Sequence, residues 1–382
     1  MIYLDNAATT RVADGVAAIM DRYHHDLFAN PSSIHRGGVL GAKGIRVAAD
    51  LFAAILEVPS TEIVFTSGGT ESDNLAIRGA VAACPKRLRQ GGNVVCTAVE
   101  HPAVLDACRS LDELGVETRT APVDCFGQID LAALEALIDE STLLVSVMQA
   151  NNEVGTVQPL AKVGRILSRK DPRPVFHVDA VQSFLKEPLS VHDSGIDLLS
   201  LSSHKLHGPK GVGLLWVKKG INLRPLFFGG GQQGGVRPGT QNVPGIVGFA
   251  EAVRLGHLSR VEDNERMRAL RIRLWQGIRE RIAEVDLNGH PRERLCNNLH
   301  INFHGCKGEL LLHHLEAEGL YVSAGSACHS AKDEPSPVLK AMGVKSDRGA
   351  LRLSLSRETT ESEIDQAIEI VARAVFEVRS MS

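Results

Sequence analysis

Between residues 60 and 217 the sequence alternates between short β-rich runs and helix-patterned stretches, and this alternation limits the possible folds more than any other feature. The β-rich runs are residues 62–66, 93–98, 143–149, 174–180, 197–202 and 212–217. Most of the gaps between them hold a stretch with helical periodicity, such as LAKVGRILSRK at residues 160–170. This pattern predicts an α/β fold with a mostly parallel central sheet covered by helices on both faces. The last two runs are too close for a helical crossover, so they predict an antiparallel hairpin.

The pattern changes after about residue 258 and predicts a smaller α+β unit. Its expected elements are a long amphipathic helix over 265–285, a strand over 297–303, a helix over 309–319, a strand over 350–356 and a final helix from near Thr360. A chain of 382 residues is also long for a single core. We therefore expect a large domain over residues 13–258 and a small domain formed by residues 1–12 and 259–382.

Composition and charge exclude several classes of function. The net charge of −3 gives no electrostatic case for binding nucleic acid or an acidic membrane surface. No apolar run reaches membrane-spanning length, and the first residues lack the features of an export signal. The seven cysteines are scattered without a C-x-x-C pair, which favours reduced thiols in the cytoplasm over disulfides or a zinc site. No metal site is expected, since no carboxylate joins the C-terminal histidines at ligand spacing; these are His300, His304, His313 and His314.

Polar residues follow the predicted strands at the point where each strand ends. In chain order they are Gly68, Gly69 and Thr70, then His101, then Asn152, then Asp179 and Gln182, then Ser202, His204 and Lys205. Ligands of open α/β sheets bind beyond the carboxyl ends of the strands, so these side chains are expected to share one edge.

Each of these residues has an ordinary interpretation by itself, such as a turn, a helix cap or a solvated lysine. Together they match what pyridoxal 5′-phosphate needs. Its phosphate suits the start of the helix that begins near Gly69 and Thr70. The flat side chain of His101 can stack on its pyridine ring, and the carboxylate of Asp179 can pair with its pyridine nitrogen. Its aldehyde needs an amine, and Lys205 lies at the end of a buried strand. We therefore interpret Lys205 as a Schiff-base lysine.

A set of motifs strengthens this interpretation. The motifs include YLDNAATT, FTSGGTESDNLAI, VEHPAVL, NNEVG, HVDAVQS, SSHKLHGPKGVG, FGGGQQGGVRPGTQN, SAGSACHSA and LRLSLSRETTESEID. In their order and spacing from residue 3 to about 366, the chain resembles the NifS/IscS-like cysteine desulfurases. These are fold-type I pyridoxal-phosphate enzymes of the class V aminotransferase group. The chain departs from many relatives at Ser203, where they have Gly, and at His329, where they have Thr.

The resemblance implies a role for each matching position. Lys205 would link to the cofactor, Asp179 would pair with the pyridine nitrogen, Gln182 would bond the ring oxygen, and His101 would stack on the ring and move protons. The remaining cofactor contacts would come from Gly69, Thr70, Asn152, Ser202 and His204, and from Thr240 reaching the phosphate of a partner subunit. The substrate would be bound by Asn30, Asn152 and Arg352. The contact by Thr240 implies a homodimer.

Cys328 decides the reaction that this cofactor would serve. It lies among small residues in SAGSACHSAKDEPSP, which leaves a thiol accessible to a substrate. The loop and the resemblance together indicate a nucleophile that takes sulfur from L-cysteine, releases L-alanine and passes the sulfur to an acceptor protein such as an iron–sulfur scaffold. The other six cysteines are expected to be buried and structural. Three alternatives stay open: a selenocysteine lyase, an ordinary aminotransferase, and a non-catalytic scaffold for sulfur-carrier partners.

Overall fold

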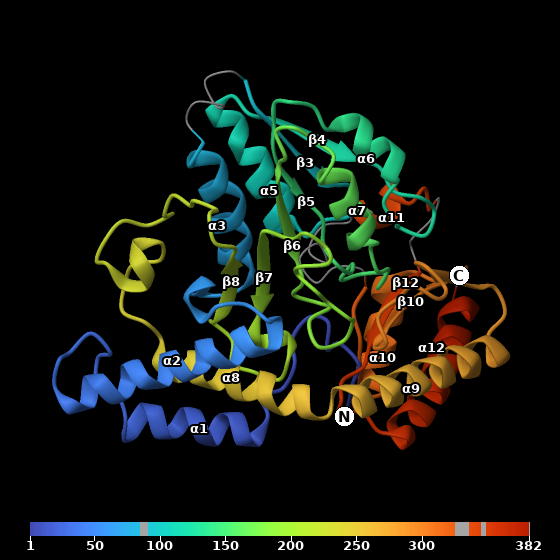
Figure 1. Ribbon diagram of the computed structural model, residues 1–382. Helices are drawn as coiled ribbons and strands as arrows, with labels where there is room; N and C mark the ends of the chain where they lie inside the picture. Colours follow the sequence, from blue (N-terminus) through green and yellow to red (C-terminus); the bar gives the residue numbers. More distant parts are fainter. Residues whose placement is uncertain (85–90, 325–335, 345–348, 382) are drawn as a thin grey trace.

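The computed structural model describes residues 1–84, 91–324, 336–344 and 349–381, and its centre is a seven-stranded sheet in the order β2-β8-β7-β6-β5-β3-β4. The strands are β2 (Ile63–Thr66), β3 (Asn93–Thr97), β4 (Glu117–Ala121), β5 (Thr142–Ser146), β6 (Val175–Asp179), β7 (Leu198–Ser202) and β8 (Gly213–Val217). Strand β8 runs antiparallel to both of its neighbours, and the other pairs are parallel. The mostly parallel sheet and the hairpin of the last two runs are therefore confirmed (Figure 1).

Strand β4 is the member of this sheet that sequence analysis missed. Its sequence, ETRTA, is polar, and most of its side chains are at least partly exposed. It lies at the edge of the sheet and pairs with β3 alone. An edge strand needs little apolar surface, because one row of backbone hydrogen bonds to its neighbour can hold it, so it leaves a weak signal in the sequence.

Helices cover both faces of the seven-stranded sheet (Figure 1). Helices α3 (Gly69–Ala82) and α5 (Pro102–Arg109) contribute apolar side chains to the core on one face. The other face is covered by α2 (Arg36–Leu56), α6 (Leu131–Leu137), α7 (Leu160–Leu167) and α8 (Val243–Leu258). Helix α1 (Asp14–His25) packs outside α8. Short 3-10 turns lie at η1 (Ser60–Glu62), η2 (Ser110–Leu114), η3 (Ser203–Lys205) and η4 (Gln232–Gly235).

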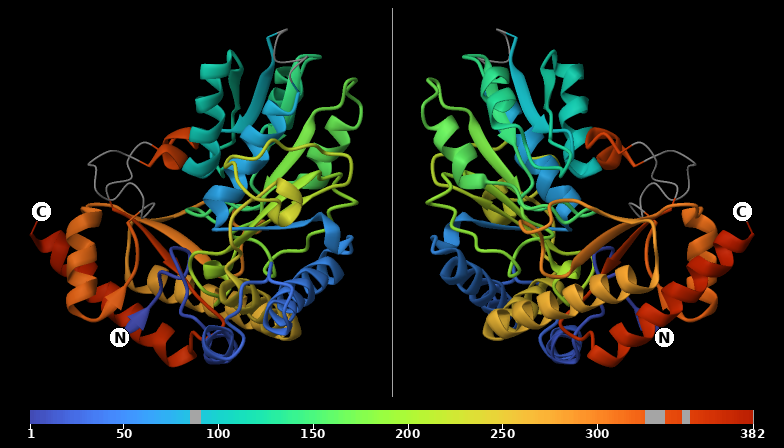
Figure 2. Two further views of the ribbon diagram at one scale, coloured as in Figure 1. Left: turned by 90° about the vertical axis from the view of Figure 1, so that its left-hand side faces the viewer. Right: turned by 90° about the vertical axis from the view of Figure 1, so that its right-hand side faces the viewer.

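A second, antiparallel sheet in the order β12-β10-β9 has a hydrophobic core of its own. Its strands are β9 (Val285–Asn288), β10 (Asn298–Phe303) and β12 (Ala350–Ser354), and its helices are α9 (Arg260–Arg281), α10 (Gly308–Ala317) and α12 (Glu361–Ser380). Helix α11 (Pro337–Ala341) and the parallel pair of β1 (Ile2–Tyr3) with β11 (Leu320–Tyr321) complete the described elements. Figure 2 shows this part, in orange and red, beside the larger sheet. The exact domain bounds stay a prediction.

Two ends of the predicted elements can be compared directly. The long helix was expected over 265–285, but α9 begins at Arg260 and ends at Arg281. It ends earlier than expected because strand β9 already begins at Val285. The final helix begins as expected: Thr360 caps α12, and its side chain and that of Glu363 form a capping box. No helix in the described part of the chain is both long enough and apolar enough to span a membrane.

The segment of residues 4–10, called here the N-terminal strap, connects the two sheets. On one side the Asn6 side chain donates to the Ser354 carbonyl, and the Ala7 amide donates to the Ser354 hydroxyl. On the other side the Thr10 hydroxyl donates to the carbonyl of His204, beside Lys205. The strap therefore crosses from β12 to the end of β7, where the candidate site lies.

Candidate active site

The candidate site is built where parallel strands of the large sheet end. Strand β6 ends at Asp179, and β7 ends at Ser202 and continues directly into the turn that holds Lys205. Asp179 pairs with Ser200 across the two strands, so the ends of β6 and β7 are adjacent. Helix α3 starts at Gly69 on the same edge. The predicted convergence of these residues is therefore observed.

Lys205 lies in an environment that favours its uncharged amine. Its Nζ donates to the carbonyls of Ala7 (2.6 Å) and Ala8 (2.7 Å) in the N-terminal strap. Burial lowers the pKa of the amine to about 8, and the positive charges of Arg352 and Lys186 add to this effect, while Asp5 and Asp179 oppose it. An amine with a pKa near neutrality is a usable nucleophile toward an aldehyde.

Asp179 is a buried carboxylate whose charge is opposed by burial and supported by its neighbours. Its Oδ1 accepts a hydrogen bond from the Val181 amide at 2.8 Å. Burial raises its pKa to about 6, while the Val181 hydrogen bond and the charge of Lys205 act in the opposite direction. The group is therefore mainly ionised at pH 7, as a partner for a protonated ring nitrogen must be.

An anion cradle lies between the start of α3 and the end of β7. The Ser202 hydroxyl is buried and has no hydrogen-bond partner among the described residues. A Cβ placed on Gly69 would lie 3.7 Å from Ser202 Cβ and 3.0 Å from Val181 Cγ2, so glycine keeps this space open. Thr70 is exposed in the first turn of α3. A helix N-terminus beside a buried, unpartnered hydroxyl fits a phosphate group.

Two further predicted residues contact the N-terminal strap, and a third, His101, lies at the start of α5. His204 Nδ1 is 3.1 Å from the Thr9 hydroxyl, and burial together with Lys205 and Lys210 lowers its pKa to about 4, so it is neutral at pH 7. Gln182 Nε2 donates to the Ala7 carbonyl at 3.0 Å. His101 precedes α5 and its Nδ1 accepts from the Ala103 amide, which fixes the orientation of the ring.

Arg352 is buried at 2% exposure, which rules out a solvated arginine on an outer face. As the strand alternation predicts, Leu351 and Leu353 point into the small core. The guanidinium donates from Nη2 to Asp5 at 2.8 Å and from Nη1 to the Asn152 carbonyl at 3.0 Å. Two residues predicted to bind substrate, Arg352 and Asn152, are therefore in direct contact.

A buried acidic group behind Asp179 was missed by sequence analysis. Asp73, on α3, lies 3.6 Å from His177, which shares a face of β6 with Asp179. Burial and the charge of Asp179 raise the pKa of Asp73 well above its usual range, and burial lowers that of His177 to about 3. Glu100 accepts from the Thr97 hydroxyl and the Met148 amide, and burial also raises its pKa well above the usual range. Burial therefore disfavours a second negative charge on Asp73 or Glu100 beside Asp179. The i, i+2 spacing of His177 and Asp179 was the one available signal.

Three predicted residues are not joined to this group in the structure. Asn30 lies in the turn between α1 and α2, at the outer end of these helices (Figure 1). Thr240 is exposed in the loop before α8. Cys328 lies outside the described residues. The roles of all three stay predictions, and that of Thr240 requires a second copy of the chain.

The remaining cysteines differ in part from expectation. Cys96, Cys108, Cys296 and Cys306 are buried, as expected, and Cys84 is half-buried. The expectation was wrong for Cys125, which is exposed. It lies in the tight turn where the Asp124 carboxylate accepts from the amides of Phe126 and Gln128, so its side chain points away from the core.

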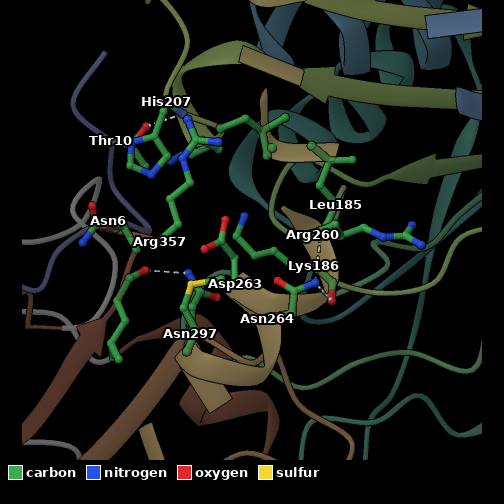
Figure 3. Close-up of a pocket in the computed structure, with 16 residues that line it drawn as sticks. Asn6, Thr10, Leu185, Lys186, His207, Arg260, Asp263, Asn264, Asn297 and Arg357 are labelled. Carbon is green, nitrogen blue, oxygen red and sulfur yellow. Dashed lines mark hydrogen bonds between the residues drawn. The ribbon is translucent and has the colours of Figure 1, made fainter. Parts of the chain in front are cut away.

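A pocket adjoins the strap and the Lys205 loop (Figure 3). Figure 3 shows Asn6 and Thr10 of the strap on one side, with Asn264 of α9 and Lys186 on another. The Asn264 side chain donates to the carbonyls of Leu185 and Lys186. The pocket therefore lies where the two sheets and the α8–α9 junction meet. No group of three or more potential metal ligands was found in the described ranges of the chain.

Comparison with known proteins gives a consistent result. Residues 2–367 match the family model described as aminotransferase class-V. The chain is 43% identical to Cysteine desulfurase 2 of Trichormus variabilis over 384 residues, covering 100% of this chain and 95% of the relative. It is 43% identical to Cysteine desulfurase IscS of Methanosarcina thermophila over 383 residues, covering 100% and 93%. A solved structure titled NifS-like protein superposes with a TM-score of 0.91 at 38% identity, covering 97% of this chain and 98% of that one.

Proposed function

The chain belongs to the class-V aminotransferase family and is a cysteine desulfurase, and we propose that it holds pyridoxal 5′-phosphate on Lys205 and transfers sulfur from L-cysteine to Cys328. The observation that supports this most strongly is the convergence of three groups: the lowered pKa of the Lys205 amine, the ionised Asp179, and the unpartnered Ser202 hydroxyl beside the start of α3. These are an amine for the aldehyde, a carboxylate for the ring nitrogen and a cradle for the phosphate.

When bound, the cofactor supplies an electron sink for the Cα of the substrate amino acid. The chain supplies the rest. Asp179 would hold the proton on the ring nitrogen, and burial disfavours a competing negative charge on Asp73 and Glu100. Lys205, once its amine is free, takes the Cα proton, and the strap carbonyls of Ala7 and Ala8 are within hydrogen-bond distance to receive its ammonium form.

The substrate carboxylate is proposed to bind Arg352. A guanidinium gives a carboxylate two parallel hydrogen bonds, which a lysine cannot reproduce. Burial of Arg352 beside Lys205 would orient the Cα–H bond toward the amine that removes its proton.

The sulfur step is assigned to the Cys328 thiolate. It attacks the substrate sulfur; the bond from that sulfur to Cβ breaks, and its electron pair stays with the carbon fragment, which is then protonated. Cys328 gains one sulfur atom as a persulfide, and the remaining fragment leaves as L-alanine, so atoms and electrons balance without an external oxidant. The persulfide is then available to an acceptor protein, for which an iron–sulfur scaffold is one candidate class.

The replacement of Cys328 by serine tests this proposal. Cys328→Ser keeps the size of the side chain and removes the easily ionised nucleophile. The variant should still bind the cofactor and shift its visible absorption on adding L-cysteine. Its release of alanine should fall by at least about a hundredfold. Mass spectrometry of the wild-type protein after L-cysteine should find the extra sulfur on the peptide that contains Cys328.

Cys125→Ser is the matched control, because Cys125 is the exposed cysteine of the described residues. It should retain full activity. Desulfuration by Cys328→Ser at the wild-type rate would refute the persulfide step. Loss of cysteine activity with retained selenocysteine cleavage would restrict the role of the thiol to sulfur.

A further inference from the structure

The buried guanidinium of Arg352 has one ionic partner in the described part of the chain, the Asp5 carboxylate. Asp5 is 347 residues away in sequence, and its Oδ1 is 2.8 Å from Arg352 Nη2. An isolated buried cation is costly, so an opposite charge at this distance stabilises the ionised guanidinium in the absence of substrate. No motif role assigned above includes Asp5.

The hydrogen bonds of Arg352 leave a specific set of donors free. A guanidinium has five N–H groups. One on Nη2 is used by Asp5, and one on Nη1 is used by the Asn152 carbonyl. Three N–H groups therefore remain, one on each terminal nitrogen and one on Nε, which has no hydrogen-bond partner among the described residues. A carboxylate needs two of them for a pair of hydrogen bonds.

The strap fixes the position of Asp5. Residue 5 pairs with Ser354 in an isolated parallel bridge, and Ser354 shares a face of β12 with Arg352 because the two are separated by one residue. The Ala8 amide donates to the Asp5 carbonyl at 3.0 Å, and the Asn6 and Ala7 contacts to Ser354 hold the next two residues. Asp5 is therefore held in place at the backbone on both sides of its side chain.

We infer that Asp5 is a positioning residue for substrate recognition: it orients and charge-balances Arg352 so that the free N–H groups of the guanidinium face the α-carboxylate of the amino acid. This inference rests on the proposed function, in which Arg352 binds that carboxylate. The same strap brings the Ala7 and Ala8 carbonyls to Lys205, so one segment sets both the carboxylate site and the amine.

The test compares two ligands that differ only in the carboxylate. L-Alanine, the product, carries it, and ethylamine is L-alanine without it. Both amines are titrated into the cofactor-loaded enzyme, and the shift of its visible absorption gives an apparent Kd without turnover. Asp5→Asn keeps the shape and an acceptor oxygen but removes the charge. It should raise the apparent Kd for L-alanine roughly tenfold, the factor expected for loss of one charge-assisted hydrogen bond. The apparent Kd for ethylamine should stay within about twofold, since ethylamine has no carboxylate for Arg352 to hold.

Steady-state kinetics give a second measurement. The KM for L-cysteine should rise by a similar factor in Asp5→Asn, while kcat changes little, because Asp5 acts on binding of the carboxylate. The control variant Asp14→Asn removes the surface-exposed ion pair between Asp14 and Arg11. It should leave the apparent Kd for both ligands unchanged. If Asp5→Asn does not load with cofactor, Asp5→Glu is used in its place. Its longer side chain should raise the apparent Kd for L-alanine but not that for ethylamine, and by a smaller factor than is expected for Asp5→Asn.

Further variants separate this inference from the proposed function. Arg352→Lys should weaken the binding of L-alanine but not that of ethylamine. Adding Asp5→Asn to this variant should have little further effect on either apparent Kd. If Arg352→Lys weakens L-alanine but Asp5→Asn does not, the inference is wrong and the carboxylate site stands. If Arg352→Lys has no effect, both are wrong. Equal weakening of L-alanine and ethylamine by Asp5→Asn would also overturn the inference, because Asp5 would then act on the cofactor or the fold.

Discussion

At the scale of single residues, the proposed chemistry depends on how the surroundings of Lys205 differ from those of an ordinary lysine. Lys218 is also near the sheet, but it is half-exposed and donates to the Asp197 carboxylate. Lys205 has two carbonyls as partners and two cations among its neighbours. Carbonyls accept hydrogen bonds without supplying a negative charge, so burial and repulsion determine the direction of the pKa shift.

This environment predicts how cofactor capture depends on pH. With a pKa of about 8, roughly a tenth of the Lys205 amine is uncharged at pH 7 and about nine tenths at pH 9. The rate at which cofactor-free protein captures pyridoxal phosphate should therefore rise about tenfold over this interval and then level off. Stopped-flow absorbance measures it. Lys205→Ala should show no covalent capture at any pH, and Lys218→Arg should match the wild type. A rise centred above pH 10 would mean that Lys205 titrates like an ordinary lysine.

At the scale of elements, the layers around the sheet depend on close backbone contacts. Helix α7 lies on the face covered by α6 and α8, and its Gly164 faces the turn that carries Ser194. A Cβ on Gly164 would lie 2.0 Å from the Ser194 carbonyl oxygen. Because this neighbour is backbone, it cannot rotate away as the end of a side chain could.

Gly164→Ala should therefore destabilise the protein, although alanine is the better helix former. Overpacking of this kind typically lowers the free energy of unfolding by about 1–3 kcal/mol, which exceeds the gain in helix propensity of about 1 kcal/mol. Urea unfolding followed by circular dichroism measures the difference. Gly15→Ala, in α1, is the control, since its Cβ would meet side-chain atoms no closer than 3.6 Å; it should cause no loss. Equal stability of the wild type and Gly164→Ala would show that the α7 contact adjusts at no cost.

At the scale of the whole molecule, exposed apolar side chains gather at one side. Phe227 and Phe228 lie in the loop before α8, and Phe228 is 89% exposed. Phe28 and Ile34 are exposed in the turn between α1 and α2, and Figure 1 shows both segments at its left-hand side. Surfaces of this kind usually mark contacts between proteins. The same loop carries Thr240, the residue that was expected to act in a second copy of the chain.

Removing the two phenylalanines should therefore disrupt a homodimer. The variant Phe227→Ser with Phe228→Ser should shift sedimentation from dimer to monomer and raise the apparent Kd for pyridoxal phosphate at least about tenfold, because Thr240 of a partner would no longer reach the phosphate. Phe376→Ser is the control: Phe376 is also highly exposed but lies on α12, away from this side. A wild-type protein that sediments as a monomer at micromolar concentration would refute this prediction.

Much of the fold followed from the sequence because the information was local. Each of the six predicted runs is a strand of the large sheet. These runs could be recognised because strands that are buried on both faces consist largely of β-branched and apolar residues. The position of most residues of the candidate site followed as well, because parallel strands place the residues after their ends at one edge. Asp179, Ser202 and Lys205 could be located by that rule alone. Strand β4 could not be predicted in this way, because it is a polar edge strand and lacks a run of apolar residues.

The tertiary structure decided the contacts between residues distant in sequence. Nothing local to Asp5 or Arg352 indicates that they form a pair, and the exposure of Cys125 depends on a turn held by the Asp124 side chain. The raised pKa values of Asp73 and Glu100 likewise arise because α3 and the chain after β3 bury both carboxyls behind Asp179. Sequence determined which residues could form strands and which chemistry they could carry. The packing of two separate cores, joined by the N-terminal strap, decided which charges meet and which amine loses its proton, because burial and the distance between charges are properties of the assembled molecule.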